Sequence, residues 1–133
     1  MPEAKLFFVY GTLRRGDDND ITRLSPAPQF IGHASIAGTM FHLGGYPGVT
    51  LGGVGRILGE VYAVCAELEK KLDAIESEYP AQSDEYFKRE IQIEVDGKSL
   101  ACHVYEINTA YVQGKPVMAS GDWVKDRASQ KIG

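Results

Sequence analysis

Residues 56–78, RILGEVYAVCAELEKKLDAIESE, decide the fold because their hydrophobic period changes once. Up to residue 64 the side chains alternate between two faces, as they do in a β-strand. From residue 66 to 78 the apolar positions recur at i, i+4 and i+7, which predicts an α-helix. These positions are Leu68, Leu72 and Ile75. The sequence therefore predicts a strand that leads directly into a helix.

Other segments indicate further strands. Residues 6–10 are a run of aromatic and β-branched side chains that ends at Gly11. Residues 86–95 and 99–107 read as two more strands, and Asp96-Gly97 between them is a strong signal for a two-residue hairpin turn. We expect an α+β fold, formed by a single domain over residues 1–133, in which a strongly curved or barrel-like sheet packs against one or two helices.

The remaining segments are predicted to be less regular. Residues 42–57 hold six glycines, which favours loops and turns everywhere except at the ends. Residues 30–41 are expected to form a pair of strands broken near Gly38. Residues 17–28 are polar and should form mostly loop, with one helical turn near residues 21–24. Trp123 is expected to dock in a short element near the C-terminus.

Composition excludes several classes of function. The formal net charge is −4 and 24% of the residues are charged, so nothing favours a nucleic-acid partner. No stretch approaches the roughly eighteen apolar residues of a membrane span, so no membrane association is expected. Cys65 and Cys102 are too few for a disulfide scaffold and lie in apolar runs, which favours reduced, buried thiols. We therefore expect a cytoplasmic protein.

The sequence also lacks the common signals for bound metals and nucleotides. The three histidines do not have the spacing of metal ligands, and no cysteine motif accompanies them, so no metal site is expected. They are His33, His42 and His103. Neither a phosphate-binding Gly-x-x-x-x-Gly-Lys loop nor a Gly-x-Ser-x-Gly nucleophile elbow is present.

Glu76 is the first candidate for chemistry. It lies about 40° from Leu72 around the predicted helix, on the flank of the apolar stripe. It also stands at the C-terminal end, where unsatisfied carbonyl groups disfavour negative charge. Partial burial and the helix dipole should both raise the pKa of Glu76, which suits a general acid or base near neutral pH. A solvated glutamate at a helix end is the alternative.

Glu60 is the second candidate, because it shares a strand face with apolar side chains. A buried carboxylate needs a partner, and Arg89, on an otherwise apolar face of its own strand, is the expected one. A structural Glu60–Arg89 ion pair is the favoured interpretation, and a catalytic carboxylate is the alternative.

The segment after the first strand, Tyr-Gly-Thr-Leu at residues 10–13, is the third candidate. Glycine permits backbone dihedrals that aim successive N–H groups at a carboxylate or an oxyanion. An ordinary exit from a strand is the alternative. Arg14 and Arg15 follow; they either add positive charge at the rim of this site or simply face water.

Three motifs together resemble the γ-glutamylcyclotransferase-like (AIG2-like) family: FVYGTLRRG at 8–16, GEVYAV at 59–64 and LDAIE at 72–76. CHVYEI and SGDW downstream extend the resemblance from Phe8 to about Trp123. It implies a small mixed β-barrel with packed helices. It also implies intramolecular attack of a γ-glutamyl α-amine on its own γ-carbonyl, which releases 5-oxoproline and a free amine without a cofactor or metal.

The resemblance also implies roles for individual residues. The substrate loop falls on Tyr10, Gly11, Thr12 and Leu13, the acid/base glutamate falls on Glu76, and Tyr105 falls where the family has a tyrosine near the site. The family commonly shows Tyr-x-Arg after the loop that follows the glutamate, whereas this chain has Phe87-Lys88-Arg89, with Tyr86 one residue early.

This departure leaves the substrate open. A small γ-glutamyl amine or γ-glutamyl amino acid is the expected partner. The alternatives are a non-enzymatic binding module on the same fold, and an acyltransferase or amidohydrolase that yields glutamate instead of 5-oxoproline.

Overall fold

The computed structural model of the chain describes residues 5–11, 14, 20–43, 47–78, 86–118 and 121–123, and of residues 54, 73–78 and 86 it describes the backbone alone. The elements in chain order are β1 (Lys5–Val9), the 3₁₀ turn η1 (Ile21–Arg23), β2 (Gln29–His42), β3 (Pro47–Val64), α1 (Ala66–Glu78), β4 (Tyr86–Val95), β5 (Lys98–Ile107) and the 3₁₀ turn η2 (Thr109–Tyr111).

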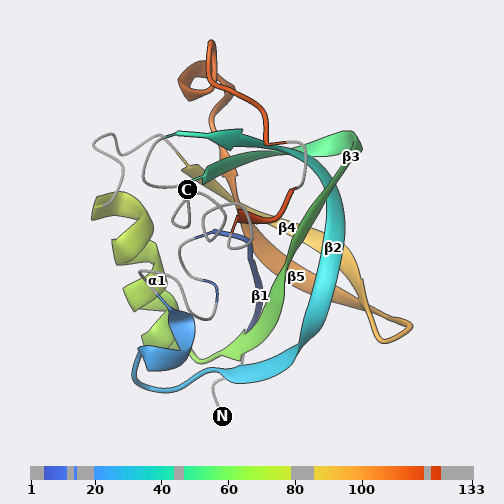
Figure 1. Cartoon of the computed structure of the whole chain (residues 1–133). Helices are drawn as coiled ribbons and strands as arrows, with labels where there is room; N and C mark the ends of the chain where they lie inside the picture. The colour runs from blue at the N-terminus through green and yellow to red at the C-terminus, as the bar shows by residue number, and fades with distance from the viewer. Residues whose placement is uncertain are drawn as a thin grey trace, which may run out of the picture.

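The five strands form one curved sheet in the order β2-β3-β1-β5-β4, with α1 against one side (Figure 1). Strand β1 runs antiparallel to β3 and parallel to β5, so the sheet is mixed. The edge strands β2 and β4 approach each other: a Cβ atom built at Gly32 on β2 would lie 2.6 Å from Cγ1 of Val95 on β4. The strand order nevertheless does not pair β2 with β4. The α+β class and the mixed sheet are confirmed, whereas these five strands do not close into a barrel.

Alternate side chains of β1 enter two separate hydrophobic clusters. Phe8 joins a cluster to which all five strands contribute, and Phe7 joins a second cluster between the sheet and α1. The second cluster consists of Phe7, Val9, Ile21, Tyr62, Val64, Leu68, Leu72 and Tyr105. Strand β1 is therefore buried on both faces, as expected from its unbroken apolar run.

Helix α1 spans the predicted residues 66–78 and begins directly after β3, which confirms the change of period. Leu68 and Leu72 are fully buried on the sheet, as the apolar stripe predicted. At the start of the helix Glu69 accepts a hydrogen bond from Lys88 Nζ on β4 at 2.7 Å and forms an ion pair with Lys5 on β1 at 3.3 Å. These contacts tie the first turns of α1 to two strands.

The β4–β5 hairpin also agrees with the prediction. Asp96 and Gly97 have φ angles of 51° and 79°, the two positive values that a type I′ turn requires. The single helical turn expected near residues 21–24 is η1. Trp123 is 2% exposed and packs in the cluster shared by all five strands, so its docking is confirmed.

The predictions for residues 30–41 and 42–57 are wrong. Strand β2 continues through Gly38, and β3 begins at Pro47, so the glycine-rich segment pairs with β2 over most of its length. The register shifts where Ala37 pairs with Arg56 but Gly38 pairs with Leu51. Gly52, with φ of 90°, lies in the resulting excursion, where a side chain would meet no atom within 4 Å. The glycines therefore build an irregularity into a long strand pair instead of ending it.

Both cysteines are free, as predicted, but only Cys102 is buried and Cys65 is half-buried. Among the helices that the structure describes, none has the length and hydropathy needed to cross a membrane.

Candidate functional site

The end of β1 is attached to its neighbours by hydrogen bonds and close packing. The phenol of Tyr10 donates to the carbonyl oxygen of Tyr105 on β5 at 2.6 Å, and Tyr10 is 7% exposed. At the next position a Cβ atom on Gly11 would lie 2.6 Å from Cγ of Pro47 at the start of β3. This position therefore has no room for a side chain, and the backbone of Gly11 lies directly against β3.

Arg14 turns back toward β1. Its backbone N–H donates to the carbonyl oxygen of Gly11 at 3.0 Å. Thr12 and Leu13, which the resemblance assigns to the substrate loop, lie outside the described residues, so their roles stay predictions.

The side chain of Arg14 enters a group of polar residues that we call the Arg14 cluster: Arg14, Glu60, Tyr62 and Asp122. Arg14 Nε donates to Glu60 Oε2 at 2.8 Å, and Nη1 donates to Asp122 Oδ1 at 2.7 Å. The Tyr62 hydroxyl donates to the other oxygen of Glu60, Oε1, at 3.0 Å. Each oxygen of the Glu60 carboxylate is thus engaged.

The cluster is largely removed from water. Glu60 is 4% exposed and the side chain of Arg14 is 12% exposed. Burial acts to lower the pKa of Arg14, but the hydrogen bonds to Glu60 and Asp122 outweigh it, so the pKa is raised above its ordinary value. The guanidinium is therefore charged at any working pH, and it compensates a carboxylate that would be costly to bury alone.

Strand pairing explains how the chain assembles this cluster. Val9 on β1 pairs with Glu60 on β3, and Glu60 and Tyr62 lie two residues apart on the same face. Asp122 arrives from the C-terminal segment, where the Leu58 N–H donates to the carbonyl oxygen of Gly121 at 2.8 Å. Gly121 has φ of 64° and a Cβ atom there would collide with the carbonyl of Arg56, so this approach requires glycine.

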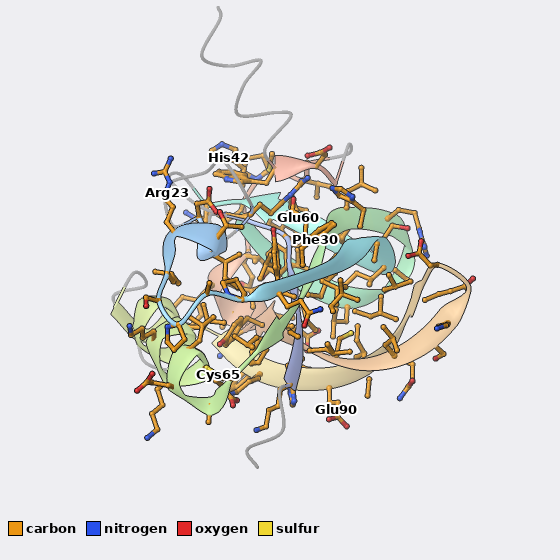
Figure 2. All side chains as sticks on the ribbon, turned by 90° about the horizontal axis from the view of Figure 1, so that it is seen from below. Arg23, Phe30, His42, Glu60, Cys65 and Glu90 are labelled. Carbon is orange, nitrogen blue, oxygen red and sulfur yellow. The ribbon has the colours of Figure 1, made fainter. Side chains whose placement is uncertain are left out.

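The predicted Glu60–Arg89 pair is wrong. Arg89 forms an ion pair with Glu106 at 3.1 Å, and its side chain is 51% exposed. Strands β1 and β5 separate β3 from β4 in the sheet, which puts Glu60 and Arg89 on strands that are not neighbours. Figure 2 shows Glu60 among the strands, whereas Glu90 projects from the edge of the molecule. The expectation that Glu60 is a buried carboxylate is confirmed, and its cation is Arg14.

The other predicted site residues are only partly described. Tyr105 is 6% exposed and its ring lies 6.0 Å from that of Phe7, in the cluster beneath α1. Glu76 belongs to the last turns of α1, but its side chain lies outside the described part of the chain. Within the described residues, no three histidine, cysteine, aspartate or glutamate side chains gather in a way that could hold a metal ion.

A family model described as gamma-glutamyl cyclotransferase, AIG2-like, matches residues 7–125. The chain belongs to this AIG2-like family. The match begins within β1 and spans the other four strands, α1 and the Arg14 cluster, so the segments that meet at the end of β1 are all part of the family domain.

Several relatives of this AIG2-like chain have names or structures. A gamma-L-glutamyl-butirosin B gamma-glutamyl cyclotransferase from Niallia circulans is 38% identical over 93 residues, which cover 68% of this chain and 58% of that protein. YkqA from Bacillus subtilis has a TM-score of 0.75 at 27% identity, with 98% of this chain and 43% of YkqA covered. An AIG2-like protein from Mus musculus has a TM-score of 0.73 at 26% identity, covering 88% and 87%.

The chain thus spans about half the length of the first two of these relatives. The two solved structures share this fold over most of the chain, as their TM-scores of 0.75 and 0.73 show.

Sequence reasoning missed Arg14 and Asp122 as partners of Glu60. A signal for Arg14 was available: pairing the first strand with residues 56–64 puts Glu60 opposite Val9, close to the first arginine that follows. No comparable signal pointed to Asp122, because its position depends on a long-range backbone contact of Gly121.

Proposed function

We propose that this AIG2-like chain is a γ-glutamyl cyclotransferase that releases 5-oxoproline from a γ-glutamyl amine or a γ-glutamyl amino acid. In the proposed step the α-amine nitrogen bonds to the γ-carbonyl carbon, and the bond from that carbon to the leaving nitrogen breaks. The α-ammonium group loses two protons, one before the attack and one as the ring forms, and both reach the departing nitrogen, which leaves as an ammonium group. The reaction closes a ring within one molecule, so it needs no second substrate.

The observation that supports this proposal is the shared direction of β1 and α1. The Lys5–Glu69 ion pair joins the start of β1 to the start of α1. From there both elements run the same way, upward in Figure 1. Gly11 follows six residues after Lys5, about 20 Å of extended chain and two residues past the end of β1, and Glu76 follows seven residues after Glu69, about 10 Å farther along the helix. Gly11 and the backbone of Glu76 thus lie toward the same end of the molecule.

The proposed roles follow from what each group offers. Backbone N–H groups in the Tyr10–Leu13 segment would hold the α-carboxylate or the developing oxyanion. Glu76 would take each proton from the attacking nitrogen in turn and pass it to the leaving amine. The fixed end of β1 favours ring closure, because holding amine and carbonyl in reacting geometry removes an entropic cost. Tyr105 would lie beside the bound substrate. Its backbone carbonyl already accepts a hydrogen bond from the Tyr10 hydroxyl.

The substrate class follows from the family and from one relative. The Niallia circulans protein is named for action on γ-L-glutamyl-butirosin B, a γ-glutamyl compound. We infer that this chain also takes a small molecule with a γ-glutamyl group. The leaving amine is the variable part, and Phe87 at the position of the usual tyrosine is the departure most relevant to it.

The decisive experiment is a panel of γ-glutamyl amines, amino acids and peptides, with products identified by mass. Wild type should release 5-oxoproline from at least one of them. Glu76→Gln should lose about 10²–10⁴-fold in rate, because glutamine keeps the shape of glutamate but cannot carry a proton. Glu67→Gln, the same change at an exposed position of α1, is the matched control and should retain full activity.

Three other outcomes of this experiment would each favour a different role. A Glu76→Gln variant as fast as wild type would exclude Glu76 as the base and make Glu60 the next candidate. Release of glutamate instead of 5-oxoproline would indicate an amidohydrolase. Binding without turnover across the panel would favour a non-enzymatic binding module.

A further inference from the structure

We propose that Arg14 is a positioning residue for the reaction described above: by bridging Glu60 and Asp122 it fixes the end of β1 in the orientation that substrate requires. This inference rests on the proposed function and adds a residue to it. It assigns Arg14 no contact with the reacting atoms.

The charges of the Arg14 cluster argue against direct binding of an anionic substrate. One guanidinium lies between two carboxylates, with donor–acceptor distances of 2.8 Å to Glu60 and 2.7 Å to Asp122. Its positive charge is already compensated within the cluster. A substrate carboxylate approaching Arg14 would therefore also meet the carboxylates of Glu60 and Asp122. We therefore assign Arg14 the role of positioning the backbone instead of binding the substrate.

The geometry of the Arg14 guanidinium suits this positioning role. Nε and Nη1 belong to one rigid planar group, and they donate to residues on two different segments, β3 and the C-terminal segment that contains Asp122. A planar fork satisfies both acceptors in one orientation only, which a lysine ammonium cannot reproduce.

The orientation of the side chain is transmitted to the backbone. The Arg14 N–H donates to the Gly11 carbonyl at 3.0 Å, and Gly11 packs against Pro47. Tyr10, one residue earlier, is tied to β5 through the Tyr105 carbonyl. Tyr10, Gly11 and Arg14 are thus held by β5, β3 and the C-terminal segment, and Arg14 supplies the connections to Glu60 on β3 and to Asp122.

A purely structural role would also follow from burial, because removing Arg14 takes the charged donor away from the buried Glu60 carboxylate. The test must therefore separate stability from positioning. Arg14→Lys keeps the charge but loses the fork. The triple variant Arg14→Met, Glu60→Gln, Asp122→Asn removes the fork together with the two carboxylate charges that it compensates.

Three properties are measured for each variant: Tm, the steady-state constants kcat and KM with a γ-glutamyl substrate, and the hydrogen-exchange rate of the backbone amide of residue 14. Arg14→Lys should exchange this amide faster and lose about 10–100-fold in kcat/KM, with a fall in kcat as well as a rise in KM. The triple variant should recover most of the Tm lost in Arg14→Met alone, yet keep the low kcat/KM. Arg23→Gln, at a side chain that is 75% exposed and lies 3.8 Å from Asp20, is the control and should match wild type in all three.

Two results would overturn the proposal. The first is an Arg14→Lys variant whose amide exchange and kcat/KM equal those of wild type. The second is a triple variant in which kcat/KM recovers together with Tm, since the role of Arg14 would then be stability alone. A wild type that turns over no γ-glutamyl compound overturns the proposed function itself, together with the kinetic role of Arg14. The exchange rate, which needs no substrate, still decides whether Arg14 fixes the end of β1.

Discussion

Cys102 and Cys65 differ in how far solvent reaches their sulfur atoms. Cys102 is fully buried on β5, and this burial raises the pKa of its thiol from 9.0 to about 11. At pH 8 about one Cys102 in a thousand would be the reactive thiolate. Cys65 is half-buried at the junction between β3 and α1.

We therefore predict that iodoacetamide at pH 8 labels the folded protein once, at Cys65, and labels Cys102 only in denaturant. Intact-protein mass spectrometry counts the added groups. Cys65→Ser should show no label before unfolding. Rapid labelling of folded Cys65→Ser would mean that solvent reaches β5 more readily than its burial implies.

At the same scale, single residues show what the sequence can predict about the candidate site. That Glu60 is buried followed from its place among apolar neighbours, because alternation along one strand is a local property. Its partner did not follow, because the choice between Arg89 and Arg14 depends on which strands are neighbours. Arg14 lies on the segment that leaves β1, and β1 pairs directly with β3.

Among the elements, α1 is fastened to the sheet at its first turns by Glu69. Burial acts to raise the pKa of Glu69, but the hydrogen bond and charge of Lys88, and then those of Lys5, outweigh it and lower the pKa below its ordinary value of 4.5. A carboxylate whose pKa is lower in the folded state stabilises that state above the ordinary pKa. The stabilisation is lost as pH falls through the lowered value.

We predict that Glu69→Gln is less stable than wild type by about 0.5–1 kcal/mol at pH 7, a modest value because Lys5 is half exposed and solvent screens the pair. The difference should shrink toward zero below pH 4. Urea unfolding at pH 7 and pH 3 measures it, with the exposed Glu67→Gln as control. An equal difference at both pH values would show that packing, rather than charge, accounts for the contribution of Glu69.

The elements that were predicted correctly are those with strong local signals. Helix α1 and the β4–β5 hairpin depend on periodicity and on Asp96-Gly97, all within about a dozen residues. The β2–β3 pair was missed because glycine can mark either a loop or a point in a strand where another backbone approaches closely. Gly38 stays in its strand because the backbone of β3 approaches it closely, with Thr50 O 2.7 Å from where a Cβ atom would be. Such an approach is set by the partner strand and leaves no mark in the local sequence.

For the whole molecule, the C-terminal segment belongs to the main hydrophobic cluster. Trp123, the only tryptophan in the sequence, packs with side chains from all five strands. We predict that tryptophan fluorescence and far-UV circular dichroism report the same urea transition, because Trp123 cannot separate without opening that cluster. A fluorescence change at clearly lower urea would mean that the segment detaches while the sheet remains folded.

The Arg14–Asp122 hydrogen bond has a consequence for synthesis, since it joins positions 108 residues apart. A ribosome adds residues from the N-terminus, so Arg14 emerges early while Asp122 is still absent. Until then the Glu60 carboxylate and the Arg14 guanidinium can meet, but the second arm of the fork has no acceptor. Any nascent chain or fragment that stops before residue 122 therefore carries the Tyr-Gly-Thr-Leu motif with its anchor incomplete, and completion of the anchor coincides with the burial of Trp123 one residue later.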